Sequence, residues 1–224
     1  MLTTERRLGA GPILRAGSRA PYRSVVAEPG EPHLVRSELV PKAPAGDVGA
    51  RGGAIACIGH ISDLHVTDVQ SPARFEFVNR EWEDPRFRQL LTMQRPHEAL
   101  TSRAIEALLR TLDQIERAPL SGSPIELVAM TGDSIDNTQL NELTNFLALM
   151  DGGTVRPDSG APGYDGVQAV GWPSEIFWKP DGAPDRDLFQ AALGFPSVPG
   201  LLERAMEPFQ ARGLGLRWLG CYGN

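Results

Sequence analysis

The chain has 224 residues, a hydrophobic fraction of 41% and a formal net charge of −6 at pH 7. This length suits one large domain or two small ones, and the apolar content is sufficient for a sizeable core. The acidic balance argues against a nucleic-acid-binding surface, because phosphate backbones require a concentration of Lys and Arg. No apolar run is long enough to cross a bilayer, so we expect no membrane partner either.

The first 53 residues have a composition of their own. Gly-Pro, Pro-Gly and Gly-Gly pairs separate only two strand-like runs, Val25-Val26 and residues 33 to 40. We therefore predict an N-terminal arm over residues 1–53 that wraps over a domain formed by residues 54–224 and can contribute one edge strand. Arg6-Arg7 is similar to a twin-arginine export signal, but no hydrophobic segment follows it. A cytoplasmic location is the expectation, with export as the alternative.

An apolar run from Ala54 to Ser62 predicts a buried central strand, and it ends in Asp63-Leu64-His65. Residues two apart on an extended segment point the same way, so Asp63 and His65 should project together. A carboxylate beside an imidazole is half of a metal site. His60 has the opposite parity and is interpreted as a hydrogen-bonded histidine rather than a ligand.

The segment from Val66 to Arg95 is long, charged and aromatic, and long loops of this kind are usually functional. It should overhang Asp63 and His65. Its arginines either meet an anionic substrate or belong to a solvated insertion, and the sequence leaves both interpretations open.

A second apolar strand, residues 125 to 130, runs into Thr131-Gly132-Asp133 after a helix predicted over Pro96 to Arg117. Strand, helix and strand in this order form a right-handed parallel crossover, whose strands end on one edge of the sheet. Asp133 should therefore reach the same rim as Asp63 and His65.

The rest of the chain predicts two helices, a long excursion and a third strand. Cys57 and Cys221 lie in strand-like runs and are expected to be buried free thiols. The predicted elements are a helix from Asn137 or Thr138 to Asp151 that buries Leu140, Leu143, Leu147 and Met150, a hairpin of residues 167–170 against 176–178 whose aromatic residues anchor the loop, a helix from Pro199 that carries Leu201 to Phe209 and ends at Gly213, and a buried strand over Leu214 to Tyr222.

Three motifs each follow an apolar strand: Asp63-x-His65, Gly132-Asp133-x-x-Asp136-Asn137 and Gly223-Asn224. In this order they resemble the calcineurin-like metallophosphoesterases. The resemblance implies an α/β fold, namely the front half of a four-layer α/β/β/α sandwich with a central β-α-β-α-β unit and long loops. A haloacid dehalogenase-like fold would need Asp-x-Asp after its first strand, and His65 argues against it.

The resemblance also implies a site for two divalent metals, which can be Mn, Fe, Zn or Mg. Asp63 and His65 would hold the first metal, Asp133 would bridge both, and the amide oxygen of Asn224 would serve the second. Supporting roles that do not include binding metal fall to Asp136, Asn137 and Asp68. Gly132 and Gly223 would let the backbone turn tightly at the strand ends.

The function that the resemblance implies is hydrolysis of phosphate mono- or diesters by a metal-bridging hydroxide. In the family the third motif continues into a histidine and further ligands follow, whereas this sequence ends at Asn224. The expectation is therefore a truncated domain with an incomplete site, weakened metal binding and sheet edges open to self-association. The alternative is a non-catalytic remnant that binds one metal or a partner without turnover.

Overall fold

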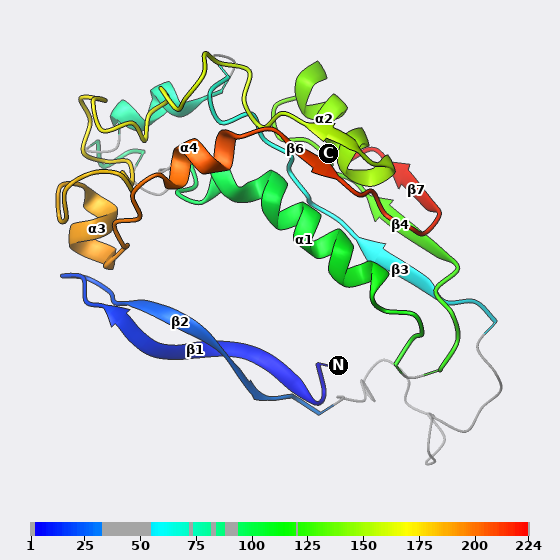
Figure 1. Cartoon of the computed structure of the whole chain (residues 1–224). Coiled ribbons are helices and arrows are strands. Elements are labelled where there is room, and N and C mark those ends of the chain that lie inside the picture. The colour runs from blue at the N-terminus through cyan, green and yellow to red at the C-terminus, as the bar shows by residue number, and fades with distance from the viewer. Residues whose placement is uncertain are drawn as a thin grey trace.

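The computed structural model describes residues 3–32, 55–71, 74–81, 84–87, 94–119 and 121–223. They form a mixed α/β arrangement around a parallel sheet, as predicted (Figure 1). The elements are β1 (Arg6–Arg15), β2 (Tyr22–Pro29), β3 (Ile58–Ile61), α1 (Thr101–Asp113), β4 (Leu127–Thr131), α2 (Leu140–Asp151), β5 (Gly153–Val155), α3 (Leu188–Leu193), α4 (Leu201–Met206), β6 (Phe209–Ala211) and β7 (Trp218–Cys221), with 3-10 helices at Glu76–Glu81 and Glu98–Leu100.

The parallel sheet has the strand order β3-β4-β7. Ile58 pairs with Leu127 and Val128 with Trp218, and both pairings are parallel. The predicted crossover from β3 through α1 to β4 is confirmed, and the strands end on one edge. Within the described residues the predicted central position of β3 is wrong: β4, flanked on both sides, is the central strand, and β3 lies at an edge with Ile58 largely exposed.

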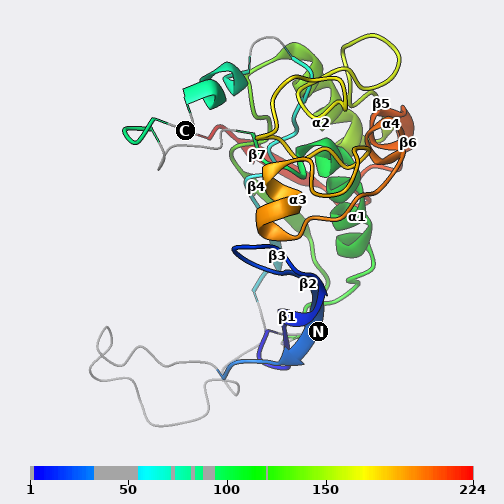
Figure 2. The ribbon, with the colours of Figure 1, turned by 90° about the vertical axis from the view of Figure 1, so that its left-hand side faces the viewer.

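The core lies on one face of this sheet. Val128 and Met130 of β4 are buried there in one cluster with side chains of both α1 and α2. Figure 2 shows both helices on the same side of the sheet. On the other face Ile58 and Leu219 remain largely exposed within the described residues. The prediction of a buried third strand is therefore wrong for β7. Cys221 at its end is exposed and Cys57 is half-buried, although both thiols are free as expected.

Helices α1 and α2 are shorter than predicted. A 3-10 turn over Glu98–Leu100 precedes α1, which ends at Asp113 and buries Ile105 and Leu109. The predicted face of α2 is wrong: Leu140, Leu143 and Leu147 are exposed, and the buried residues are Glu142, Asn145, Phe146, Leu149 and Met150. On the buried face Phe146, Leu149 and Met150 join the apolar core, and Glu142 accepts hydrogen bonds from the backbone N–H groups of Asp68 and Asn137.

The region after α2 differs most from the sequence analysis. Residues 167–178 form turns and not the predicted hairpin, although Phe177 and Trp178 are buried, as expected of residues that anchor a loop. Helix α3 was not predicted. The helix predicted from Pro199 to Gly213 ends at Met206, because the chain there pairs β6 with β5 in an antiparallel ladder.

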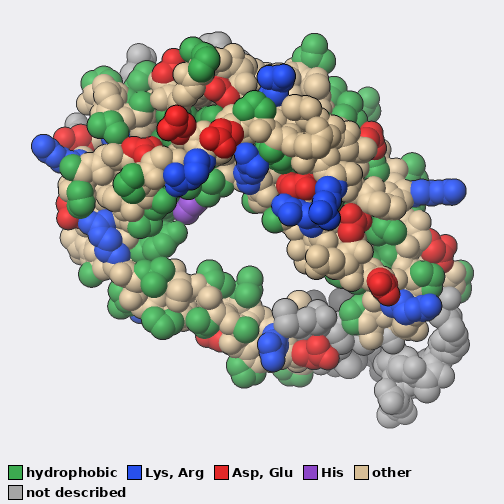
Figure 3. All heavy atoms as spheres, viewed as in Figure 1, with side chains coloured by type: hydrophobic (Ala, Val, Ile, Leu, Met, Phe, Trp, Pro, Cys, Tyr) green, Lys and Arg blue, Asp and Glu red, His purple; other side chains and the backbone are tan. Residues whose placement is uncertain are grey.

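The described part of the N-terminal arm is an antiparallel hairpin of β1 and β2 that forms a sheet of its own. Its tip is attached to the body: Ser18 and Arg19 donate backbone hydrogen bonds to Ala191 and Ala192, and the Tyr22 ring packs on Phe195. Beyond the tip, open space separates the hairpin from the body (Figure 3). The predicted edge strand in the main sheet is therefore not contributed by this hairpin, and residues 33–54 lie outside the described chain.

None of the helices within the described residues is both long and apolar enough to cross a bilayer.

Candidate metal centre

The segments that follow β3 and β4 run side by side beyond the sheet. Asp63 donates its backbone N–H to the Gly132 carbonyl over 3.1 Å, and His65 donates to the Asp133 carbonyl over 2.9 Å. A parallel bridge between Val66 and Ile135 continues the pairing. We call these two paired segments, residues 62–71 and 131–139, the rim. Their pairing brings the predicted ligands together across more than 65 positions of sequence.

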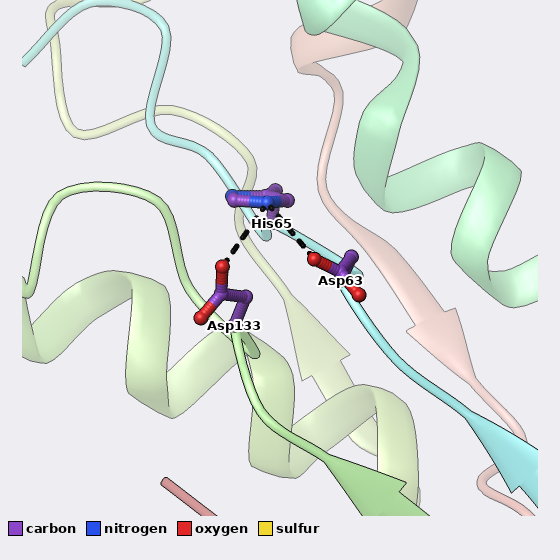
Figure 4. Close-up of side chains that lie close together, drawn as sticks. All are labelled: Asp63, His65 and Asp133. Atoms are coloured by element: carbon purple, nitrogen blue, oxygen red, sulfur yellow. Dashed lines mark ion pairs between the residues drawn. The ribbon is translucent and has the colours of Figure 1, made fainter. Parts of the chain in front are cut away.

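Asp63, His65 and Asp133 all have a left-handed backbone, with φ of 56°, 46° and 50°. This region is uncommon for residues other than glycine, although Asp and His enter it more readily than most. Three such residues at two adjacent strand ends are an unusual concentration of strain, of a kind that is often found at functional sites. The turns direct the three side chains toward one another (Figure 4).

The distances between the three side chains fit a common cation. His65 Nε2 lies 3.7 Å from Asp133 Oδ2 and 4.0 Å from Asp63 Oδ1. One ligand atom from each residue lies within 4.8 Å of the others. Two ligands that are each about 2.0–2.2 Å from one ion are at most about 4.4 Å apart, so both histidine distances are compatible with shared ligation. The Asp63 side chain is 65% exposed, which leaves the group open to solvent.

Asp136 lies at the other nitrogen of the imidazole. His65 Nδ1 and Asp136 Oδ1 are 3.1 Å apart. Because an ionised carboxylate only accepts, His65 donates from Nδ1, and in the neutral imidazole the lone pair of Nε2 then faces Asp63 and Asp133. Asp136 is thus placed to fix the ring, the kind of supporting role that the sequence analysis gives it.

Within the described residues no hydrogen bond joins the predicted supporting residues Asp68 and Asn137 to Asp63 or Asp133. Both instead meet Glu142 of α2, which is fully buried. Glu142 accepts backbone N–H bonds from Asp68 over 3.0 Å and from Asn137 over 2.7 Å, and a further bond from the Asn137 amide. Glu142 was not predicted from the sequence. The available signal was its place in the first turn of α2, three residues after Gln139, where a glutamate often reaches back to free N–H groups.

Asn224 lies outside the described residues, and its place relative to the other ligands is not assigned. Its neighbour Gly223 lies directly against the rim. A Cβ on Gly223 would come within 1.7 Å of Asp133 Oδ1, and one on Gly132 within 2.6 Å of the Gly223 backbone. Gly132 has the predicted positive φ, of 106°, whereas Gly223 is required for this close approach of two backbones.

Both long excursions are fastened to the rim. The Gln70 side chain accepts backbone N–H bonds from Asp165 and Gly166, and Ser159 donates to Asp68. In the first excursion, Arg74 and Arg95 face Asp136, while Arg86 pairs only with Asp84 among the recorded ion pairs. The first excursion therefore lies beside the ligand group, as its position in the sequence predicts, and the second contacts the rim at Asp68 and Gln70.

No protein-family model, no curated protein and no solved structure matches the chain. The case for a function therefore comes from the geometry of this site.

Proposed function

We propose that the chain is a metal-dependent phosphoesterase domain, of the calcineurin-like kind, that acts on phosphate mono- or diesters. The observation that supports this most is the convergence of Asp63, His65 and Asp133, which come from two adjacent strand ends and share a strained backbone. Ordinary surface acids do not need such a backbone. Two carboxylates and one imidazole are a donor set that suits Mn, Fe, Zn or Mg.

In this proposal the residues of the chain bind the cation, orient the imidazole of His65 and leave an open approach for the substrate. Asp63, His65 and Asp133 hold the cation, and Asp136 keeps the His65 lone pair directed at it. When bound, such a cation polarises phosphate oxygens and lowers the pKa of water toward neutrality. The exposed side of Asp63 leaves an open approach for an ester in solution.

The proposal extends to the second cation and to the remaining layers of the fold. Asn224 would contribute its amide oxygen beside Asp133, since Gly223 already packs on that residue. A second sheet, as in the four-layer sandwich, would cover the face that carries the exposed Ile58 and Leu219.

The test combines metal binding with turnover. Titration of the purified chain with Mn²⁺ in a calorimeter should give saturable binding, and hydrolysis of an aryl phosphate and of a bis-aryl phosphate should depend on that metal. Asp133→Asn should reduce both by at least about tenfold while circular dichroism is unchanged. A chain that folds, binds no divalent cation and hydrolyses neither ester would refute the proposal.

One observation favours the alternative of a metal- or partner-binding module without turnover. The described residues bring three ligands together, a number that holds one cation but falls short of two. A binding stoichiometry of one, with no ester hydrolysis at any metal concentration, would select this alternative.

A further inference from the structure

Asp136 is held by two arginines as well as by His65. Its Oδ1 atom accepts from Arg95 Nη2 over 2.7 Å, and the same oxygen accepts from His65 Nδ1. Its Oδ2 atom lies 3.6 Å from Arg74 Nη1 and 3.4 Å from the Asn137 amide nitrogen. Both oxygens are therefore engaged, so Asp136 cannot turn toward the ligand group without breaking charged contacts.

Glu98 joins the two arginines on their far side. Its Oε1 atom accepts from the side chain of Arg95 over 2.9 Å and from the Arg95 backbone N–H over 2.8 Å. Its Oε2 atom accepts from Arg74 Nη2. The contacts close a ring in which acid and base alternate, namely Asp136, Arg95, Glu98 and Arg74.

Three of the four side chains of the ring are largely removed from water, whereas that of Arg95 is 53% exposed. Glu98 and Arg74 have side chains that are only 2% and 5% exposed, and Asp136 is 15% exposed. Buried charges of this kind are stable only when each is paired, so the four groups hold one another in place. Burial alone would lower the pKa of Arg95, but its hydrogen bonds to Glu98 and Asp136 outweigh that effect and raise it. Both arginines come from the excursion between β3 and α1, and Glu98 from the turn before α1.

We propose that Arg74, Arg95 and Glu98 are positioning residues: through Asp136 they fix the orientation and tautomer of His65, and thereby the affinity of the site for a divalent cation. The part that concerns affinity rests on the proposed function, and the part that concerns the tautomer does not. An Asp136 that is pinned on both oxygens also explains why this acid supports the ligand group without joining it.

The tautomer is tested on the metal-free protein. The chain has four histidines, so nitrogen-15 spectra of the labelled imidazoles are simple, and His65→Gln assigns the His65 signals. At about pH 8, above the usual histidine pKa, wild type should show His65 protonated at Nδ1. Arg95→Met should convert this to a mixture of both tautomers. Arg95 is chosen over Arg74 because its side chain is 53% exposed and its loss should leave the fold intact.

The matched control is Arg86→Met. Arg86 belongs to the same excursion and carries the same charge, but it pairs with Asp84 and is 79% exposed. Its spectrum should equal that of wild type. An Nδ1-protonated His65 that is unchanged in Arg95→Met would overturn the proposal, whatever the outcome of the metal titration.

The affinity is tested by calorimetric titration with Mn²⁺. Arg95→Met should weaken binding by about tenfold or more, as is common for groups that orient a metal ligand, whereas Arg86→Met should remain within about twofold of wild type. Arg95→Lys should lie in between, because lysine keeps the charge but cannot serve Asp136 and Glu98 at once. Equal affinity in Arg95→Met and wild type would exclude the role in binding. Failure of wild type itself to bind, with the tautomer shift present, would instead refute the proposed function.

Discussion

The rim and the N-terminal hairpin are held in opposite ways, and of the two only the rim contributes residues, Leu64 and Val66, to the main apolar core. The rest of the rim is mostly polar: its acid Asp68 is buried, as is Glu142 of α2, and both accept hydrogen bonds from donors of the rim. The hairpin is richer in apolar side chains, but Leu8 is 76% exposed and the attachment lies at the tip. A segment is therefore fixed here by satisfied buried groups, and apolar content alone does not show which segment is fixed.

The largest expected effect on the free energy of unfolding comes from a substitution in the core, and it is the reference for the hairpin. Leu109 in the core is 1% exposed, so Leu109→Ala should lower the free energy of unfolding by about 3–5 kcal/mol. Leu8→Ala in the hairpin should change it by less than about 0.5 kcal/mol. Urea unfolding followed by circular dichroism measures both. A loss in Leu8→Ala close to that in Leu109→Ala would show that the hairpin is packed in solution.

The second prediction concerns the rim itself. Glu142→Ala should cost about 2–4 kcal/mol, because the buried N–H groups of Asp68 and Asn137 lose their acceptor. Glu203→Ala is the matched control, since Glu203 also lies in the first turn of a helix but is exposed; its effect should stay below about 0.5 kcal/mol. Equal unfolding midpoints for the two variants would remove the contrast between rim and hairpin.

The third prediction concerns a substitution that should raise the free energy of unfolding. Thr138 at the end of the rim has φ of 57°, which is strained for a β-branched residue. Thr138→Gly should raise the free energy of unfolding by about 0.5–1 kcal/mol, whereas Thr111→Gly within α1 should lower it by about 0.5 kcal/mol. Thermal melts of both variants test this. If both melt below wild type, the rim is not strained at Thr138.

The smallest effect is expected where the hairpin docks. His97 packs on Trp178 and Phe195, and Phe195 also receives Tyr22 of the hairpin. Burial lowers the pKa of His97, so the unfolded chain takes up a proton first as the pH falls. The stability that depends on neutral His97 is complete above about pH 6.5 and is lost as the pH falls from there toward the folded pKa.

Unfolding midpoints of wild type and His97→Phe across this pH window measure that contribution. The difference between the two slopes isolates His97 from the carboxylates of the rim. Proteolysis of the hairpin should accelerate at the acidic end in wild type only. Parallel slopes would exclude His97 as the source.

The parallel strands and the rim ligands could be predicted because they depend on short patterns. Apolar runs that end in Asp63-Leu64-His65 and Gly132-Asp133, with a helix between them, permit few arrangements. The convergence of Asp63, His65 and Asp133 follows from that topology. The identity of the protein family stays a prediction.

The failures share a physical cause, which is contact between residues far apart in the chain. From the local sequence alone, Glu142 would be assigned to the solvent-facing side of α2. Its partner, the backbone N–H of Asp68, is 74 positions away in the chain. The hairpin was obscured by Gly11-Pro12, which interrupts the strand pattern and coincides with an irregular register between Ala10 and Ile13. Local periodicity contains no information about either.

The left-handed backbone at Asp63, His65 and Asp133 costs stability at the same three positions that supply the candidate metal ligands. Glycine adopts this conformation without the steric cost of about 1–2 kcal/mol that other residues bear. In a laboratory evolution experiment that selects for heat resistance alone, glycine should therefore accumulate at these sites. Selection for metal-dependent function should purge it. In one library, the ligand positions would thus be recognised because glycine becomes more frequent there under the first selection and less frequent under the second.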